Sequence, residues 1–310
     1  MNKKTPEFQS ASNRLSAGAY VALLPNRALQ LPALANVAAA QQESATPGLR
    51  GLLSALGVAQ APAALRAQAL GAGAAPLGHY YVALELCFWQ IEMGGARWMA
   101  HGEGIKLSAA ERAEITAALA ALFVSADAQL IAHSGGELSL LCDAATPAVQ
   151  AAFPDEALGC ELKNMLPNPK VWQRYLNEAQ MLLANLPVNR ARTARGEAAV
   201  NSVWFWGPER VASDLPPLAV RYQGDDAILQ ALSLPDASSP DAPHAIQMDD
   251  YIQIYDYRAL FGAELAAAVA ALPLAAKLWM NDGRVLQRRE PPGFLRGLWR
   301  VIMATVGNSS

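Results

Sequence analysis

The spacing of apolar residues predicts a helical first part of the chain, followed by alternating strands and helices. Apolar residues recur three or four positions apart over three expected helices: Ala28–Gln42, Gly48–Leu56 and Ala63–Leu70. From His79 the period changes to two, as in "HYYVALELCFWQ", and aromatic residues accumulate, which indicates a strand. We therefore expect a helical N-terminal lobe over residues 1–77 and a mixed α/β body over residues 78–310.

Two glycine-containing turns and several capping signals organise the body. Gly94 and Gly95 suit a hairpin leading into Ala96–Ala100, and "NDG" predicts a second hairpin between Ala276–Met280 and Arg284–Gln287. Further strands are expected in "AQLIAHSGGELSLLCD", "VNSVWFW" and "DDYIQIYDY", and further helices over Ser108–Phe123, Lys170–Leu186, Arg258–Leu272 and Phe294–Val306. Strands mixed with helices and hairpins favour an α/β (mixed α+β) fold, with a mixed sheet covered by helices.

Composition narrows the environment and the partners. Hydrophobic residues make up 53% of the chain and charged residues 16%, without an apolar run of membrane-spanning length, so we expect no membrane span. A net charge of −3 gives no attraction to phosphate backbones, so no nucleic-acid partner is expected. No signal-peptide core follows the first lysines, and the three cysteines lack metal or redox spacing. Buried, reduced thiols in a cytoplasmic protein are the expectation.

Familiar catalytic and metal-binding motifs are missing from the sequence. There is no G-x-S-x-G elbow, phosphate loop or G-x-G-x-x-G, and the four histidines are far apart. We therefore assign no catalytic residue, no metal ligand and no cofactor. The acidic pairs at Asp225–Asp226 and Asp249–Asp250 offer oxygen ligands, but adjacent carboxylates at the start of an element favour a capping role.

The stretch "PVNRARTARGEAAVNSVWFWG" concentrates arginine, asparagine and tryptophan. One interpretation is a ligand site, because guanidinium groups bind phosphate or carboxylate groups in a forked geometry. The ligand-binding residues would then be Asn189, Arg190, Arg192, Asn201, Trp204 and Trp206. The structural alternative has the asparagines holding a turn together, the arginines on the surface and the two tryptophans packed on one face of a strand.

The C-terminal tract "GRVLQRREPPGFLRGLWRV" carries five arginines and one acid. A basic amphipathic helix of this kind suits docking on a protein partner, and a solvated helix face is the alternative.

The chain resembles the RpfE-type regulatory protein family of proteobacteria, a group described as phosphoglycerate-mutase-like. The resemblance rests on "CFWQIEMGGARWM", "MLPNPKVWQRYLNEAQMLL" and "LNEAQMLLANLPVNRARTARGEAAVNSVWFWG", in that order. The last of these is also similar to archaeal-type cofactor-independent phosphoglycerate mutases, in the pattern P-V-N, R, G, N and W-x-W-G. Those enzymes belong to the alkaline-phosphatase superfamily and use two divalent metals and a phosphorylated serine. The metal-binding aspartate–histidine pair and D-x-x-G-H run have no counterpart here.

The resemblance implies a degenerate alkaline-phosphatase-like scaffold and a bacterial regulatory or accessory role. We expect a non-catalytic cytoplasmic protein that binds a small anionic metabolite. The alternative is a metal-dependent, phosphoglycerate-mutase-like phosphotransferase, phosphatase or isomerase, whose ligands come from scattered aspartate and histidine residues.

Overall fold

The chain forms two compact units. The computed structural model describes residues 15, 19–24, 43–44, 48–58, 60–124, 128–209, 219–233, 252–258, 260, 262–273, 276–280 and 284–287. Unit 1 comprises Met1–Val58 together with Ala212–Ser310, and unit 2 comprises Ala59–Val211.

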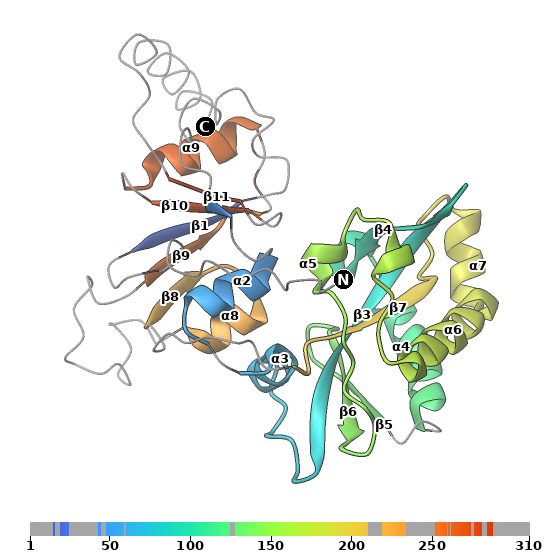
Figure 1. Ribbon diagram of the computed structural model, residues 1–310. Helices are drawn as coiled ribbons and strands as arrows, with labels where there is room; N and C mark the ends of the chain where they lie inside the picture. The colour runs from blue at the N-terminus through green and yellow to red at the C-terminus, as the bar shows by residue number, and fades with distance from the viewer. Residues whose placement is uncertain are drawn as a thin grey trace, which may run out of the picture. The chain divides into compact units, whose positions relative to one another are not determined.

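Unit 1 is built on a mixed six-stranded sheet in the order β2-β11-β10-β1-β9-β8 (Figure 1). Its strands are β1 (Tyr20–Leu24), β2 (Glu43–Ser44), β8 (Val220–Gln223), β9 (Ile252–Asp256), β10 (Lys277–Met280) and β11 (Arg284–Gln287). Strands β8, β9, β1 and β10 run parallel, β11 pairs antiparallel with β10, and β2 pairs antiparallel with β11.

The pairing of β1 explains why the units differ from the predicted lobe and body. β1 hydrogen-bonds to both β9 and β10, so residues near the N-terminus complete a sheet made by the C-terminal part of the chain. The predicted lobe over residues 1–77 is divided: strands β1 and β2 and helix α2 (Gly48–Ala55) belong to unit 1, and helix α3 (Pro62–Ala69) belongs to unit 2. Periodicity cannot show such long-range pairing.

One face of the unit 1 sheet packs against helix α9 (Gly262–Ala271). Ala22 and Leu24, two positions apart on β1, form one buried cluster with Leu265 and Val269, four positions apart on α9. The strand and helix periods therefore bring apolar stripes face to face.

One other prediction in unit 1 needs correction, and two elements were not predicted. Helix α9 begins at Gly262 rather than Arg258, because the Asp256 carboxylate accepts bonds from the backbone and side chain of Arg258 and holds a turn. Strand β8 and helix α8 (Ala227–Leu232) were not predicted. Asp226 caps α8 through its side chain, as expected for that acidic pair.

Unit 2 is built around the 14-residue strand β3 (His79–Glu92). The sheet follows the antiparallel path β4-β3-β6-β5, and β7 also pairs with β3. The partner strands are β4 (Gly95–His101), β5 (Ala128–Ala132), β6 (Leu138–Asp143) and β7 (Ser202–Trp206). Ala83 and Leu84 pair with β6 and β7 at once, so these two strands lie on opposite edges of β3.

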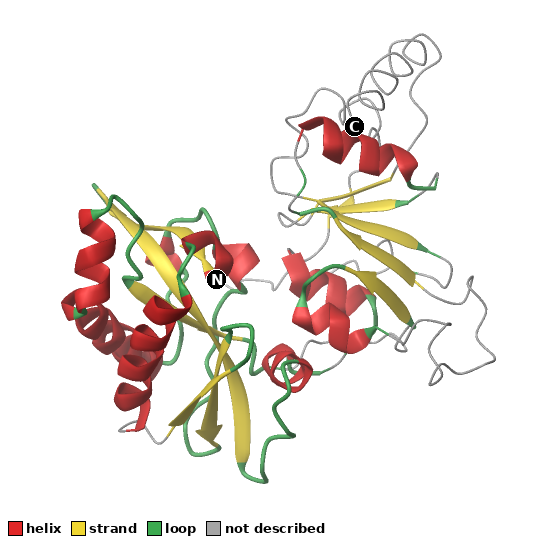
Figure 2. Cartoon of the chain, turned by 180° about the vertical axis from the view of Figure 1, so that it is seen from behind, coloured by secondary structure: helices red, strands yellow, loops and turns green. Residues whose placement is uncertain are grey.

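Helices cover one face of this sheet as a group, seen from two sides in Figures 1 and 2. They are α4 (Ala109–Val124), α6 (Lys170–Asn185) and α7 (Pro187–Ala194). Phe205 of β7 points to this layer, with ring centroids 5.9 Å from Phe123 and 5.0 Å from Trp172. Its neighbour Trp206 points to the other face and meets Phe153 at 5.0 Å. Arg66 of α3 also reaches Trp206, 5.9 Å from its ring centroid, and Phe153 directly precedes α5 (Pro154–Ala157). The short helices η2 (Gly102–Ile105) and η3 (Leu162–Asn164) contact β4.

The predicted mixed α/β fold, with hairpins and helical cover, is confirmed, although it comprises two sheets. Both predicted hairpins are present, and Ser108 and Glu111 form the predicted capping box at the start of α4. The predicted helices over Ala28–Gln42 and Phe294–Val306 lie outside the described residues.

The cysteines and the helix lengths test two further expectations. Cys87 and Cys142 are buried free thiols as predicted, whereas Cys160 is exposed, which corrects the expectation for that residue. Within the described ranges, none of the helices is long and apolar enough to cross a membrane.

Replacing Phe205 by alanine tests the packing between β7 and the helical layer. Phe205 is fully buried, so Phe205→Ala should lower the free energy of unfolding by about 3–5 kcal/mol in urea titrations. Val124→Ala, at a position that is 76% exposed, is the control and should change it by about 0.5 kcal/mol or less. Equal effects of the two substitutions would contradict this packing.

Candidate functional site

The arginine- and asparagine-rich segment begins as helix α7. Pro187 occupies the first turn, where its missing N–H costs nothing, and Gly196 takes a left-handed conformation with φ of 74° just after the helix. Asn189 lies inside this helix and does not cap its N-terminus. The N-terminus is instead capped from α4, where the Glu114 carboxylate accepts a bond from the Val188 N–H at 3.3 Å.

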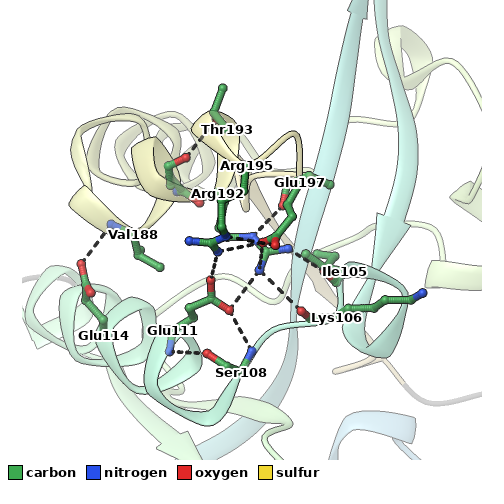
Figure 3. A network of polar contacts seen from close by, with 12 residues as sticks. Ile105, Lys106, Ser108, Glu111, Glu114, Val188, Arg192, Thr193, Arg195 and Glu197 are labelled. Atoms are coloured by element: carbon green, nitrogen blue, oxygen red, sulfur yellow. Dashed lines mark hydrogen bonds and ion pairs between the residues drawn. The ribbon is translucent and has the colours of Figure 1, made fainter.

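Arg192 is the centre of a polar network, drawn in Figure 3. Only 2% of the surface of Arg192 is exposed to solvent. Nε donates to the Ala198 carbonyl at 2.8 Å and Nη2 to the Ile105 carbonyl at 2.7 Å. Nη1 lies 3.0 Å from a Glu111 carboxylate oxygen and 3.3 Å from Glu197. The guanidinium therefore joins α7, α4 and the segment after β4, and its donors are directed at the protein itself.

Glu111 is one of the two anionic partners of Arg192 in this network. One carboxylate oxygen accepts from the Ser108 N–H at 2.8 Å, and the other lies 2.7 Å from Nη2 of Arg195. The Ser108 N–H, together with Arg195 and Arg192, lowers the pKa of Glu111 to about 2. Arg195 also forms an ion pair with Glu197 at 2.7 Å, so two carboxylates contact this guanidinium.

The two asparagines replace missing backbone hydrogen bonds. Asn189, 5% exposed, donates through Nδ2 to the Leu183 and Val200 carbonyls and accepts from the Val200 N–H. Asn201 accepts from the Trp89 N–H at 2.8 Å and donates to the Trp89 carbonyl at 2.7 Å. The Asn201 amide thus extends the pairing of β7 with β3 by imitating a strand residue.

Trp204 and Trp206 are buried on one face of β7, as the structural alternative predicted. Trp204 donates its indole N–H to the Ala152 carbonyl at 2.8 Å. Trp206 Nε1 lies 3.4 Å from a carboxylate oxygen of Glu85, and the Arg66 guanidinium lies 5.9 Å from its ring centroid.

Glu85 belongs to a buried charged group that the sequence did not indicate. Arg66 of α3 lies 3.1 Å from one of its oxygens, and His101 Nδ1 lies 3.6 Å from the other. Burial alone would raise the pKa of Glu85, but Arg66 and His101 lower it to about 2. The same face holds His133, whose Nε2 lies 3.0 Å from the hydroxyl of the fully buried Ser139. No sequence spacing links these residues, because four separate elements bring them together.

Arg190 is the exposed member of the predicted ligand set. Within the described part of the chain, its guanidinium donates to the Asn185 carbonyl at 3.0 Å and forms no ion pair. The other five predicted residues lie near one another around α7 and β7, but their polar atoms are used within the protein. The structural alternative placed the arginines on the surface, which is correct for Arg190 and Arg195 and wrong for Arg192.

A second polar cluster lies in unit 1, where β8 and β9 end. It contains Tyr222, Asp226, Asp256 and Arg258, joined by hydrogen bonds and ion pairs. Asp226 was considered as a ligand or cap from the sequence, whereas Asp256 and Arg258 were missed, because only the parallel pairing of β8 with β9 makes them neighbours. In the described ranges, no three residues among histidine, cysteine, aspartate and glutamate are grouped to hold a metal ion.

Comparison with known proteins finds distant structural similarity. No family model and no curated protein matches the chain. The chain is similar to a cofactor-independent phosphoglycerate mutase from Thermoplasma acidophilum DSM 1728, with 13% identity, a TM-score of 0.37 and coverage of 89% of this chain and 90% of that one. It is also similar to the PH0037 protein from Pyrococcus horikoshii, with 12% identity, a TM-score of 0.35 and coverage of 78% and 71%. TM-scores this low carry no inference about activity, so the RpfE-type resemblance and the alkaline-phosphatase-like scaffold stay predictions.

Substitution of Arg192 separates the buried network from the exposed arginine beside it. Arg192→Ala removes the donor to the Ala198 and Ile105 carbonyls and one of the partners of Glu111, so it should lower the free energy of unfolding by about 3–5 kcal/mol. Arg190→Ala, two residues away on α7, should change it by about 0.5 kcal/mol or less. Urea titration monitored by tryptophan fluorescence makes the comparison, and equal losses would refute the assigned roles.

The pKa of Glu111 predicts loss of stability in acid. Its folded pKa of about 2 lies below the ordinary value of 4.5, so its contribution is present above about pH 4.5 and is lost as the pH falls toward 2. The stability difference between the wild type and Glu111→Gln should therefore be largest near pH 7 and shrink by about pH 3. A difference that does not vary with pH would contradict the assignment.

Proposed function

We propose that this chain is a regulatory or accessory protein that acts by binding a small anionic metabolite rather than by catalysis. The proposal follows the RpfE-type resemblance. Its main support is the use of Arg192, Asn189 and Asn201 as internal cross-links, with donors directed at backbone carbonyls or at the half-buried carboxylate of Glu111. Side chains held in this way stabilise the fold and are poorly placed to react with a substrate.

Arg190 is the proposed contact for the anion. It is exposed on α7, and among the described residues its charge is not neutralised by a carboxylate, in contrast to Arg192 and Arg195. A guanidinium with unused donors favours a phosphate or carboxylate group. The ligand class is therefore a small phosphorylated or carboxylic acid.

Titration calorimetry of the full chain tests the binding proposal. The probes are 3-phosphoglycerate, inorganic phosphate and a nucleoside triphosphate. Binding of at least one should weaken about tenfold or more in Arg190→Ala, because a charge-assisted hydrogen bond is lost. Arg174→Ala is the matched control, since Arg174 is also exposed but pairs with Glu178 at 3.5 Å, and it should bind as the wild type does.

Three outcomes would refute the proposal. If none of the probes gives heat of binding, the proposed ligand class is refuted. If Arg190→Ala and Arg174→Ala weaken binding equally, the proposed role of Arg190 is refuted. Interconversion of phosphoglycerates by the wild type in manganese would replace the accessory role by the metal-dependent alternative.

A further inference from the structure

The polar cluster of unit 1 lies where sheets with parallel strands usually bind ligands. Asp256 is the last residue of β9, and Asp226 follows the end of β8 and starts α8. Because β8 and β9 are parallel neighbours, both carboxylates lie beyond the carboxyl edge of the sheet. Carboxylates that converge from two strand ends are typical ligands of Mg²⁺ and Mn²⁺.

Arg258 lies between these two carboxylates. Its Nη2 is 3.2 Å from Oδ2 of Asp226 and also contacts Oδ2 of Asp256. Its Nε donates to Oδ1 of Asp256 at 2.9 Å, so that carboxylate is bound in the forked geometry of arginine. A single cationic nitrogen therefore contacts an oxygen from each strand end, the arrangement that a bridging metal ion would require.

The surroundings hold the two carboxylates in this arrangement. The Tyr222 hydroxyl donates to Oδ2 of Asp256 at 2.6 Å, and Oδ1 of Asp226 accepts from two N–H groups of α8. A Cβ added at Gly224 would collide with the Tyr222 hydroxyl and with Cβ of Asp256, so the cluster is closely packed. Burial would raise the pKa of Asp256, but Arg258 lowers it overall, which keeps the carboxylate ionised.

These contacts do not fit the pair of divalent metals that the mutase resemblance implies. Asp226 and Asp256 already have the guanidinium as their cation, and both oxygens of each carboxylate have a partner. We propose that Arg258 is a built-in cation that occupies the position between Asp226 and Asp256 and excludes divalent metal ions from this strand edge. The inference rests on unit 1 alone and is independent of the anion contact proposed for Arg190.

Removal of the guanidinium should convert the cluster into a metal site. The full chain carrying Arg258→Ala is titrated with Mn²⁺, and free Mn²⁺ is followed by electron paramagnetic resonance. We expect saturable binding with a Kd of about 10⁻⁴–10⁻³ M, as for weak carboxylate sites. The double variant Arg258→Ala with Asp256→Asn should lose this binding, and the wild type should show no binding that Asp256→Asn alone removes.

Each remaining outcome decides the proposal. A folded Arg258→Ala protein that binds no Mn²⁺ overturns it, and so does wild-type binding that Asp256→Asn abolishes. If Arg258→Ala does not fold, circular dichroism with and without Mn²⁺ measures whether the ion restores its fold. The milder Arg258→Gln variant is titrated with Mn²⁺ in the same way. Recovery of the fold or binding of Mn²⁺ by either variant supports the proposal, and failure of both in Mn²⁺ refutes it.

Discussion

The pairing of β3 with three other strands is the constraint on which unit 2 depends. Side chains alternate along a strand, so the register decides which residues enter which face. In the observed register, Leu84 pairs with Phe205, whose ring packs against α4 and α6, and Glu85 pairs with Trp204 on the opposite face. A shift by one residue would bring Glu85 into the apolar helical layer, away from Arg66.

Arginine provides the second organising interaction. Arg66, Arg192 and Arg258 each join elements that are distant in sequence by bridging a carboxylate and further acceptors. The planar guanidinium suits this role because its donors diverge in fixed directions, and a buried one is tolerated only when most of them are used. This explains why residues that suggested a binding site in the sequence are cross-links in the structure. The remaining candidate positions are Arg190 and the strand ends of unit 1.

The candidate site could be predicted only in part. The sequence indicated that Pro187–Gly207 is unusual, and local rules placed its buried strand correctly, whereas helix α7 was not predicted. They could not separate Arg190 from Arg192, because both carry the same chemistry and only the approach of α4 buries one of them. Asp256 and Arg258 carried no sequence signal, since their significance comes from a parallel strand over thirty residues away.

The sequence by itself determined the local elements: the capping box at Ser108, the hairpin turns and the helices with clear apolar stripes, because these depend on neighbours within a few positions. Only the tertiary structure decided that β1 joins the C-terminal strands, that the chain divides into two units at positions other than residue 77, and which charged side chains are buried. Strand pairing and desolvation are long-range effects, and the free energies that select them arise between segments that no local pattern connects.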